Sequence, residues 1–262
     1  MQGMSDKVRI LQTGVSRYNL AETMAEFSRA IEQKGKLRIA VTPVNCLLWA
    51  RTNPELNEIY NSADIVTADG VPVVWASRLL KQPVRGRVTG LDLLPAFSEI
   101  AAQNGYSFFF LGAAEGVADQ LAEKLKTAYP ALTIAGTWSP PFRDQFTEEE
   151  NSEMIDRINR SGADVLWVSL TAPKQDFWIA RHFDKLNVSV AIGVGAAFDV
   201  VAGNISRSPQ WMQQYGLEWL YRLMKEPGRL WRRYLVEAPQ FIPLILKQYI
   251  SSQNRRKRDE KE

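Results

Sequence analysis

Short apolar runs that alternate with longer amphipathic stretches constrain the fold of residues 8–205 more than any other feature. The run FFFLGA at 108–113 is apolar at consecutive positions, which is typical of a strand buried on both faces of a sheet. Strands that alternate with helices predict an α/β fold, with a mostly parallel sheet and helices on both faces. The predicted strands are Val8–Leu11, Leu37–Val41, Ile65–Ala68, Ser107–Leu111, Leu132–Ala135, Val165–Ser169 and Val188–Gly193.

The stretches between these strands have the apolar spacing of amphipathic helices. Thr147 and Glu150 are spaced as a capping box, which predicts a helix start at this point. In such folds ligands bind beyond the carboxyl ends of the strands, so the site is expected in the loops there. The predicted helices are Leu20–Gln33, Pro54–Ser62, Val71–Leu80, Leu91–Asn104, Gly116–Ala128, Thr147–Arg160 and Lys174–Lys185.

The pattern changes after Gly203, where aromatic, basic and proline residues replace the strand-forming runs. Two helices are predicted there, at about 209–225 and 227–250, broken by Pro227, Pro239 and Pro243. The predicted organisation is an α/β domain at 1–205, a helical appendage at 206–250, and a charged, disordered tail at 251–262.

Several classes of protein are disfavoured by what the sequence lacks. Cys46 is the single cysteine, which excludes an intramolecular disulfide and favours a reducing compartment. His182 is the single histidine, so a histidine metal cluster is excluded, and an ordinary helical histidine is its simplest interpretation. The phosphate-binding patterns GxGxxG and GxxxxGK[ST] are absent, as are a signal peptide and a membrane-spanning apolar run. We therefore expect a cytoplasmic protein.

Two motifs place charged side chains near predicted strand ends. Asp69 in TADG could act as a general base, or it could cap the helix that follows. Arg87 in RVTGLDLL could clamp a diphosphate, or it could pair with Asp92.

Two further motifs favour an anionic ligand. TAPKQDFW opens a helix after a buried strand, so Lys174, Gln175 and nearby amides would face an anion. In GVGAAFD, the glycines would let the backbone approach a phosphate or base, and Asp199 could accept hydrogen bonds from a ribose. Ordinary turn chemistry is the alternative for these glycines.

Six motifs occur together in one order: TADGxPxxW, RVTGxDLL, FFFLGAAEGVA, APKQDFW, GVGAAFDVVAG and LEWLYRLMKEPGRLWRRY. Over about residues 37–236 the chain resembles the WecG/TagA/CpsF family of glycosyltransferases, also called glycosyltransferase family 26. The resemblance implies a Rossmann-like enzyme that transfers a sugar, with inversion, from a UDP-sugar to an undecaprenyl-diphosphate-linked saccharide in surface polysaccharide biosynthesis. N-acetylmannosamine, its uronate and glucose all stay open as the donor sugar.

The resemblance also implies roles for single residues. Asp69 would deprotonate the acceptor hydroxyl, Arg87 would contact phosphate, and Gln175 would lie near the diphosphate and sugar. Thr42 and Asn45 would contact the donor sugar, although one more residue separates them than in the family's Thr-x-Asn element. The family more often has Glu at the position of Asp176. The complete set of predicted nucleotide contacts is Lys174, Gly193, Gly195, Phe198 and Asp199.

Many glycosyltransferases hold a metal ion with a DxD element, which this sequence lacks. Arg87, Lys174 and helix-end amides could instead stabilise the charge that develops on departing UDP. We therefore expect transfer without a metal ion and without a cofactor.

The C-terminal region is strongly basic, with ten Lys or Arg against two acids at 222–258. Aromatic rings interleaved with these cations favour an amphipathic surface on anionic lipid, and the resemblance links this region to membrane association and completion of the active site. We therefore expect a peripheral protein on the inner face of the cell membrane. Arg222, Arg229 and Arg232 are predicted to reach the lipid diphosphate, with a solvated basic face as the alternative.

Two alternative functions stay open, together with an alternative explanation for two tryptophans of the appendage. A non-catalytic nucleotide-sugar or RNA binding module would also use a basic, aromatic segment, although no nucleic-acid partner is expected. A Rossmann-like oxidoreductase is a more distant alternative, because the glycine fingerprint is missing. Packing in a homo-oligomer could cover Trp219 and Trp231.

Overall fold

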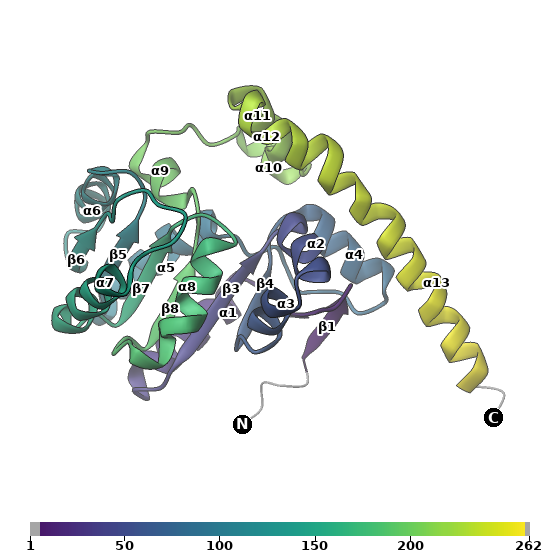
Figure 1. Cartoon of the computed structure of the whole chain (residues 1–262), viewed down its shortest axis with the longest axis horizontal. Coiled ribbons are helices and arrows are strands. Elements are labelled where there is room, and N and C mark those ends of the chain that lie inside the picture. The colour runs from purple at the N-terminus through teal and green to yellow at the C-terminus, as the bar shows by residue number, and fades with distance from the viewer. Residues whose placement is uncertain (1–5, 260–262) are drawn as a thin grey trace.

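The computed structural model describes residues 6–259, with side chains described as far as residue 254. Its centre is a six-stranded parallel sheet with the order β4-β3-β8-β7-β5-β6, as Figure 1 shows. A separate antiparallel hairpin, β1–β2, lies near the amino terminus. The strands are β1 Lys7–Ile10, β2 Thr13–Ser16, β3 Leu37–Thr42, β4 Ile65–Ala68, β5 Ser107–Gly112, β6 Thr133–Trp138, β7 Val165–Ser169 and β8 Val190–Gly193.

Strands β3, β4, β5, β7 and β8 are buried on both faces, as the consecutive apolar runs predict, whereas the edge strand β6 is partly exposed. Along β5, Phe108 and Phe110 pack into one core, while Phe109 and Leu111 pack into another on the opposite face. Successive side chains of a strand point to opposite faces, so an apolar residue is needed at every position.

Helices α1, α5, α6 and α9 contribute to the core on one face, and α2, α3, α4, α7 and α8 contribute to the cores on the other. The α/β fold class is thereby confirmed, and the predicted capping box of Thr147 and Glu150 is present at the start of α7. The helices of this part are α1 Leu20–Glu32, α2 Val44–Thr52, α3 Pro54–Asn61, α4 Val71–Leu79, α5 Gly90–Asn104, α6 Val117–Ala128, α7 Glu148–Ser161, α8 Lys174–His182 and α9 Ala197–Ala202, with a 3-10 turn at Phe183–Lys185.

The appendage packs as a series of helices over one edge of this body (Figure 1). Helix α13 is held on the core by buried Phe241 and Ile245. Gln248 also joins it to the hairpin, because its amide donates to the carbonyl oxygen of Arg9 at 2.7 Å and accepts from the amide of Leu11 at 2.8 Å. The elements are α10 Gln210–Gln214, α11 Glu218–Lys225, α12 Pro227–Trp231, a π-helical turn at Arg232–Glu237, a 3-10 turn at Ala238–Gln240 and α13 Phe241–Asp259.

The prolines of this region differ in their effects. Pro227 separates α11 from α12, as predicted. Pro239 and Pro243 do not end the helical run: Pro239 lies in the 3-10 turn, and Pro243 in the first turn of α13.

Helix α13 continues to Asp259, and so runs through most of the segment 251–262 that the sequence predicts to be a disordered tail. This stretch contains neither Gly nor Pro, the two residues that most disfavour a helix interior. Residues 260–262 of the predicted tail lie outside the described residues. None of the described helices is both long and apolar enough to span a bilayer.

Candidate active site

A cavity of about 700 Å³ opens between the carboxyl-terminal edge of the sheet and the appendage. Volumes of this size are typical of small-molecule binding sites. Strands β3, β4 and β8 or the segments that follow them form one side, and α11, α12 and the π-helical turn form the other. The predicted residues that line it are Asn45, Asp69, Arg87, Gln175, Gly193, Gly195, Arg222 and Arg229.

Asp69 follows β4 directly and lines this cavity. The cap of α4 is Gly70, whose φ of 95° suits glycine, so Asp69 is not the helix cap. In the described part of the chain, no hydrogen bond to the Asp69 carboxylate is found. Burial raises the pKa of Asp69 to about 6, against the opposing effect of the Arg87 cation. Such a carboxylate can accept a proton near neutral pH.

Arg87 takes part in a ring of four charged side chains. Its guanidinium contacts Asp92 Oδ2 at 3.1 Å and Glu218 Oε2 at 3.0 Å. Arg207 contacts the same two carboxylates, with its Nη2 on Asp92 and its Nε 3.6 Å from Glu218 Oε1. The predicted alternative of an Arg87–Asp92 pair is therefore present, and the ring joins the core to the first turn of α11.

Gln175 is positioned by the turn after β8. Its Oε1 accepts from the amide of Gly195 at 3.1 Å, and the Gly195 carbonyl oxygen accepts from Ser169 Oγ at 2.7 Å. A Cβ at Gly193 would lie 2.6 Å from Gln175 Nε2. The motifs TAPKQDFW and GVGAAFD are thus joined by the hydrogen bond from Gly195 to Gln175, and the missing side chain of Gly193 leaves room for Gln175.

Replacing Gly193 with Ala is expected to displace Gln175 and to lower kcat/KM of the transfer reaction about 10-fold to 100-fold, as small misplacements of reacting groups do. Gly35→Ala is the matched control, since the nearest atom to its Cβ would be a backbone oxygen at an ordinary 3.7 Å. Steady-state kinetics of both variants test this. Equal activity of the two variants would show that the position of Gln175 is not critical.

The appendage turns several cations toward the cavity. Arg222, Arg229 and Arg233 all line it, together with Arg87 from the core, whereas its acids are Asp69 and Glu218. Among the described residues, the buried Nε groups of Arg222 and Arg233 have no hydrogen-bond acceptor. Buried donors normally have partners, so a bound anion would complete this arrangement.

Asn45 lies in the first turn of α2 and contacts the appendage. Its Nδ2 donates to Glu237 Oε2 at 3.2 Å and to the carbonyl oxygen of Arg233 at 3.3 Å. Trp49, one turn further along α2, donates from Nε1 to the same Glu237 oxygen at 3.3 Å.

Five predicted site residues do not line the cavity. Thr42 is fully buried and donates to the carbonyl oxygen of Thr67 at 2.7 Å, so it joins β3 to β4. Lys174 turns to the Arg143 carbonyl oxygen and lies 3.8 Å from the centre of the Phe146 ring.

The other three lie on helices whose cavity-facing positions are taken by neighbouring residues. Phe198 is buried in the core, in an edge contact with Phe110. Asp199, on α9, is half-buried outside the cavity, whereas Ala197 and Val200 line it. Arg232 is exposed over the ring of Trp231.

Sequence reasoning missed Glu218, Arg233 and Tyr234 as cavity residues and placed Trp219 only at a membrane or an oligomer contact. The sequence offered one signal, an acid beside a tryptophan in the motif LEWLYR of a basic segment. Asp176, where the family more often has Glu, lies away from the cavity and accepts from Tyr60 Oη at 3.3 Å. Burial raises the pKa of Asp176 to about 7.

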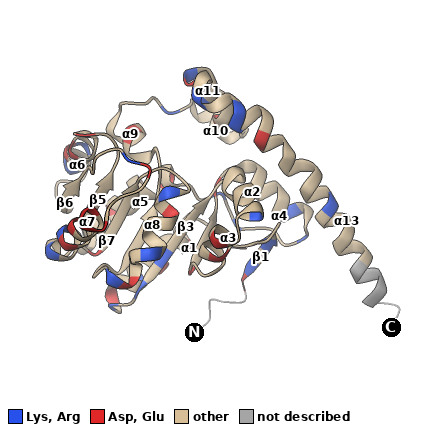
Figure 2. Cartoon of the chain, viewed as in Figure 1, with Lys and Arg blue, Asp and Glu red and all other residues tan. Residues whose placement is uncertain are grey.

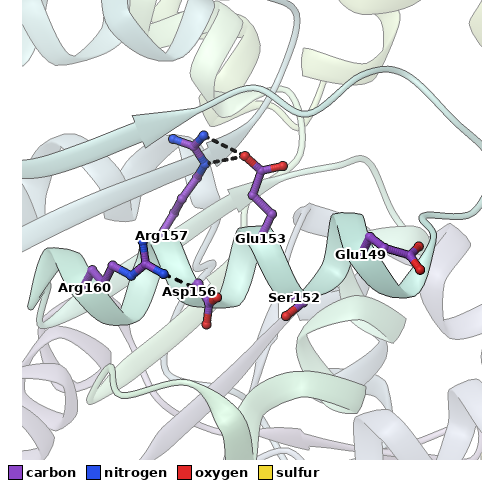
Figure 3. Close-up of a pocket in the computed structure, with 6 residues that line it drawn as sticks. All are labelled: Glu149, Ser152, Glu153, Asp156, Arg157 and Arg160. Atoms are coloured by element: carbon purple, nitrogen blue, oxygen red, sulfur yellow. Dashed lines mark hydrogen bonds and ion pairs between the residues drawn. The ribbon is translucent and has the colours of Figure 1, made fainter.

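A second depression, of about 520 Å³, lies along α7, and all of its lining residues belong to that helix. Figure 3 shows these side chains, with the pair Arg157–Glu153 at 2.6 Å and the pair Arg160–Asp156 at 3.6 Å. Pairs spaced four residues apart are usual on a solvated helix face, so this depression has a structural explanation.

Comparisons with known proteins identify the family of this chain. The model of the glycosyl transferase WecG/TagA/CpsF family matches residues 8–255. An N-acetylglucosaminyldiphosphoundecaprenol N-acetyl-beta-D-mannosaminyltransferase of Bacillus spizizenii is 35% identical, over 76% of this chain and 74% of its own length. Proteins with the same name from Bacillus subtilis (30% identity, 73% and 72% covered) and Staphylococcus aureus strain MW2 (31%, 76% and 75%) are also similar. The chain therefore belongs to the WecG/TagA/CpsF family of glycosyltransferases.

Proposed function

We propose that this glycosyltransferase moves N-acetylmannosamine from a UDP donor to N-acetylglucosaminyl-diphosphoundecaprenol, the acceptor in the relatives' names. The observation that carries the proposal is the composition of the cavity wall, which contains the Asp69 carboxylate together with four arginines. A base beside an anion site is what transfer from a nucleotide diphosphate to a hydroxyl group requires.

In the proposed reaction, Asp69 takes the proton of the acceptor hydroxyl as its oxygen attacks the anomeric carbon. The bond from this carbon to the β-phosphate oxygen breaks, and UDP leaves with the electron pair. Attack from the face opposite the leaving group inverts the anomeric centre. Positive charge on the cavity wall, including that of Arg87, stabilises the departing UDP.

The remaining cavity residues have binding roles in this proposal. Gln175 and the amides of the turn at Gly195 contact the diphosphate and sugar of the donor, and Asn45 contacts the donor sugar. Arg222 and Arg229 hold the acceptor diphosphate, as predicted from the sequence, and Arg233 joins them in place of Arg232.

The proposed chemistry relies on these guanidinium groups and not on a metal ion. UDP release is therefore expected to keep its full rate in excess chelator. A loss of at least about tenfold on chelation, restored by Mg²⁺ or Mn²⁺, would contradict this part of the proposal.

We also propose that the appendage rests on the inner face of the cell membrane, where the lipid-linked acceptor would be held. Figure 2 shows Lys and Arg on α11 and on the helical stretch that leads into α13. Large apolar side chains are exposed on that stretch and on α13, namely Trp231, Leu235, Val236, Ile242, Leu246 and Ile250. Apolar side chains beside cations favour an anionic lipid surface.

The double substitution Ile242→Glu, Leu246→Glu is expected to reduce co-sedimentation with phosphatidylglycerol vesicles at least about tenfold, because two apolar contacts are lost and two negative charges added. The control is Phe142→Glu, which changes a side chain that is 97% exposed on the loop before α7. Equal binding of both variants would place the membrane contact elsewhere.

A donor panel tests the proposed substrate. Purified protein is incubated with a short-chain N-acetylglucosaminyl-diphospholipid and, separately, with UDP-N-acetylmannosamine, its uronate, UDP-N-acetylglucosamine and UDP-glucose. Mass spectrometry of the lipid product is expected to show one added N-acetylhexosamine with the first donor. A product with another donor alone would correct the sugar, and UDP binding without any product would favour a non-catalytic binding module.

A further inference from the structure

Two carboxylates of the appendage reach back to core residues that line the cavity. Glu218, in the first turn of α11, contacts Arg87 at 3.0 Å. Glu237, at the end of the π-helical turn, accepts from Asn45 at 3.2 Å and from Trp49 at 3.3 Å. Besides the packing of Phe241 and Ile245 and the hydrogen bonds of Gln248, the appendage thus has two carboxylate contacts with the core, and each of them holds a residue of the candidate site.

The contact of Glu218 is shielded from solvent and shared. The four side chains of its ring are only 18–29% exposed. Asp92 also accepts from Thr89 Oγ1 at 2.9 Å, which fixes the core half of the ring. Because both carboxylates bridge both arginines, the position of α11 and the direction of the Arg87 guanidinium depend on each other.

The contact of Glu237 has a different chemistry. It accepts from two neutral N–H groups, and the guanidinium of the nearby Arg233 lies 5.4 Å from the centre of the Trp49 ring. A neutral carbonyl oxygen could accept the same hydrogen bonds. The shape and acceptor of this side chain therefore matter more than its charge, whereas the arginine partners of Glu218 require a negative charge.

We propose that Glu218 and Glu237 are positioning residues for sugar transfer: their contacts hold Arg87 and Asn45 in place. This inference rests on the proposed function. The two carboxylates act through their contacts with Arg87 and Asn45, and neither takes part in the bond changes.

Glu218 has a second effect that a purely structural contact would lack. Burial raises the pKa of Asp69, with Glu218 and Asp92 adding to this increase and Arg87 and Arg222 opposing it. Removing the Glu218 charge removes one of the raising effects and leaves Arg87 less neutralised. The acidic limb of the pH–rate profile should therefore move to lower pH in Glu218→Gln.

The experiment compares Glu218→Gln, Glu237→Gln and Glu237→Leu in the full chain, with Glu153→Gln as a control that breaks an exposed pair on α7 (Figure 3). Acceptor-dependent UDP release, UDP binding and Tm are measured for each variant. Glu218→Gln and Glu237→Leu are expected to lower kcat/KM for the acceptor about 10-fold to 100-fold with UDP binding retained, while Glu237→Gln stays near wild type.

Two results would overturn the inference: a Glu218→Gln variant with the kinetics and pH profile of the control, or a Glu237→Gln variant as impaired as Glu237→Leu. If Glu218→Gln does not fold, which its Tm would reveal, the pair of variants at position 237 decides alone. Failure of the proposed function gives a different result, because wild-type protein would then release no UDP with any donor and acceptor.

Discussion

Replacing Asp69 with Asn is expected to lower acceptor-dependent UDP release about 10²-fold to 10⁴-fold, the usual contribution of a general base, while UDP binding persists. Asn has nearly the same shape as Asp but does not accept a proton at neutral pH. In wild-type protein the rate should rise with pH through about 6, because the pKa of Asp69 is raised to that value and only the ionised form is a base. Kinetics from pH 5 to 9 measure both effects.

The same substitution lowers activity but is expected to raise the thermal stability of the protein at pH 8. Burial raises the pKa of Asp69 from 3.8 to about 6, so wild-type protein loses stability as the pH rises through this interval. The neutral amide of the Asp69→Asn variant avoids that loss, and the Tm of the variant should exceed that of wild type at pH 8 and match it below pH 4. The control is Asp156→Asn, on the solvated face of α7 (Figure 3). If the Asp69→Asn variant kept full activity, Asp69 could not be the base of the proposed reaction.

Replacing Arg222 with Gln is expected to lower kcat/KM for the lipid acceptor about 30-fold to 1000-fold, which corresponds to about 2–4 kcal/mol of lost anion stabilisation. Arg222 lines the cavity, and its Nε has no acceptor among the described residues. The KM for the donor should change little, because the proposed donor contacts lie mostly on the sheet side of the cavity.

Arg232→Gln is the matched comparison for Arg222→Gln, since it removes the same charge from an exposed position outside the cavity. With a short-chain acceptor in detergent, this variant should keep wild-type kinetics. Equal losses in both variants would mean that the general positive charge of the appendage matters and not a contact inside the cavity. The Tm of Arg222→Gln should not fall, because no hydrogen bond of its Nε is removed.

The fold was predictable from the sequence because consecutive apolar runs and amphipathic stretches have distinct periods. Elements without such a period were missed. Helix α2, with the sequence VNCLLWART, is apolar on several sides and follows Pro43. Strand β2 is only four residues long and contains Gly14, so its pairing with β1 carries little local signal.

Site residues that directly follow a strand could be predicted, because the position of the backbone alone brings them to the edge of the sheet. Asp69 follows a buried strand, and the carboxyl ends of parallel strands meet at one edge of the sheet. Helical residues were harder to place, because adjacent positions point about 100° apart on a helix. Arg233 lines the cavity for this reason while Arg232 faces away, and a π-helical turn shifts the direction further.

The Arg87–Glu218 contact could not be predicted, because it joins residues 131 positions apart. A sequence motif shows which residues lie close together along the chain. Arg87 and Glu218 come together only when the appendage packs on the core. The sequence therefore predicts the Arg87–Asp92 pair but not the second carboxylate.

The most direct test of the central claim measures UDP release from UDP-N-acetylmannosamine, in chelator, with and without a short-chain N-acetylglucosaminyl-diphospholipid. Wild-type protein is compared with Asp69→Asn under the same conditions. We predict release that depends on the acceptor in wild type and is nearly absent in the variant, although both bind UDP. Acceptor-dependent release of equal rate in both proteins, or no release by wild-type protein that binds UDP, would contradict this claim.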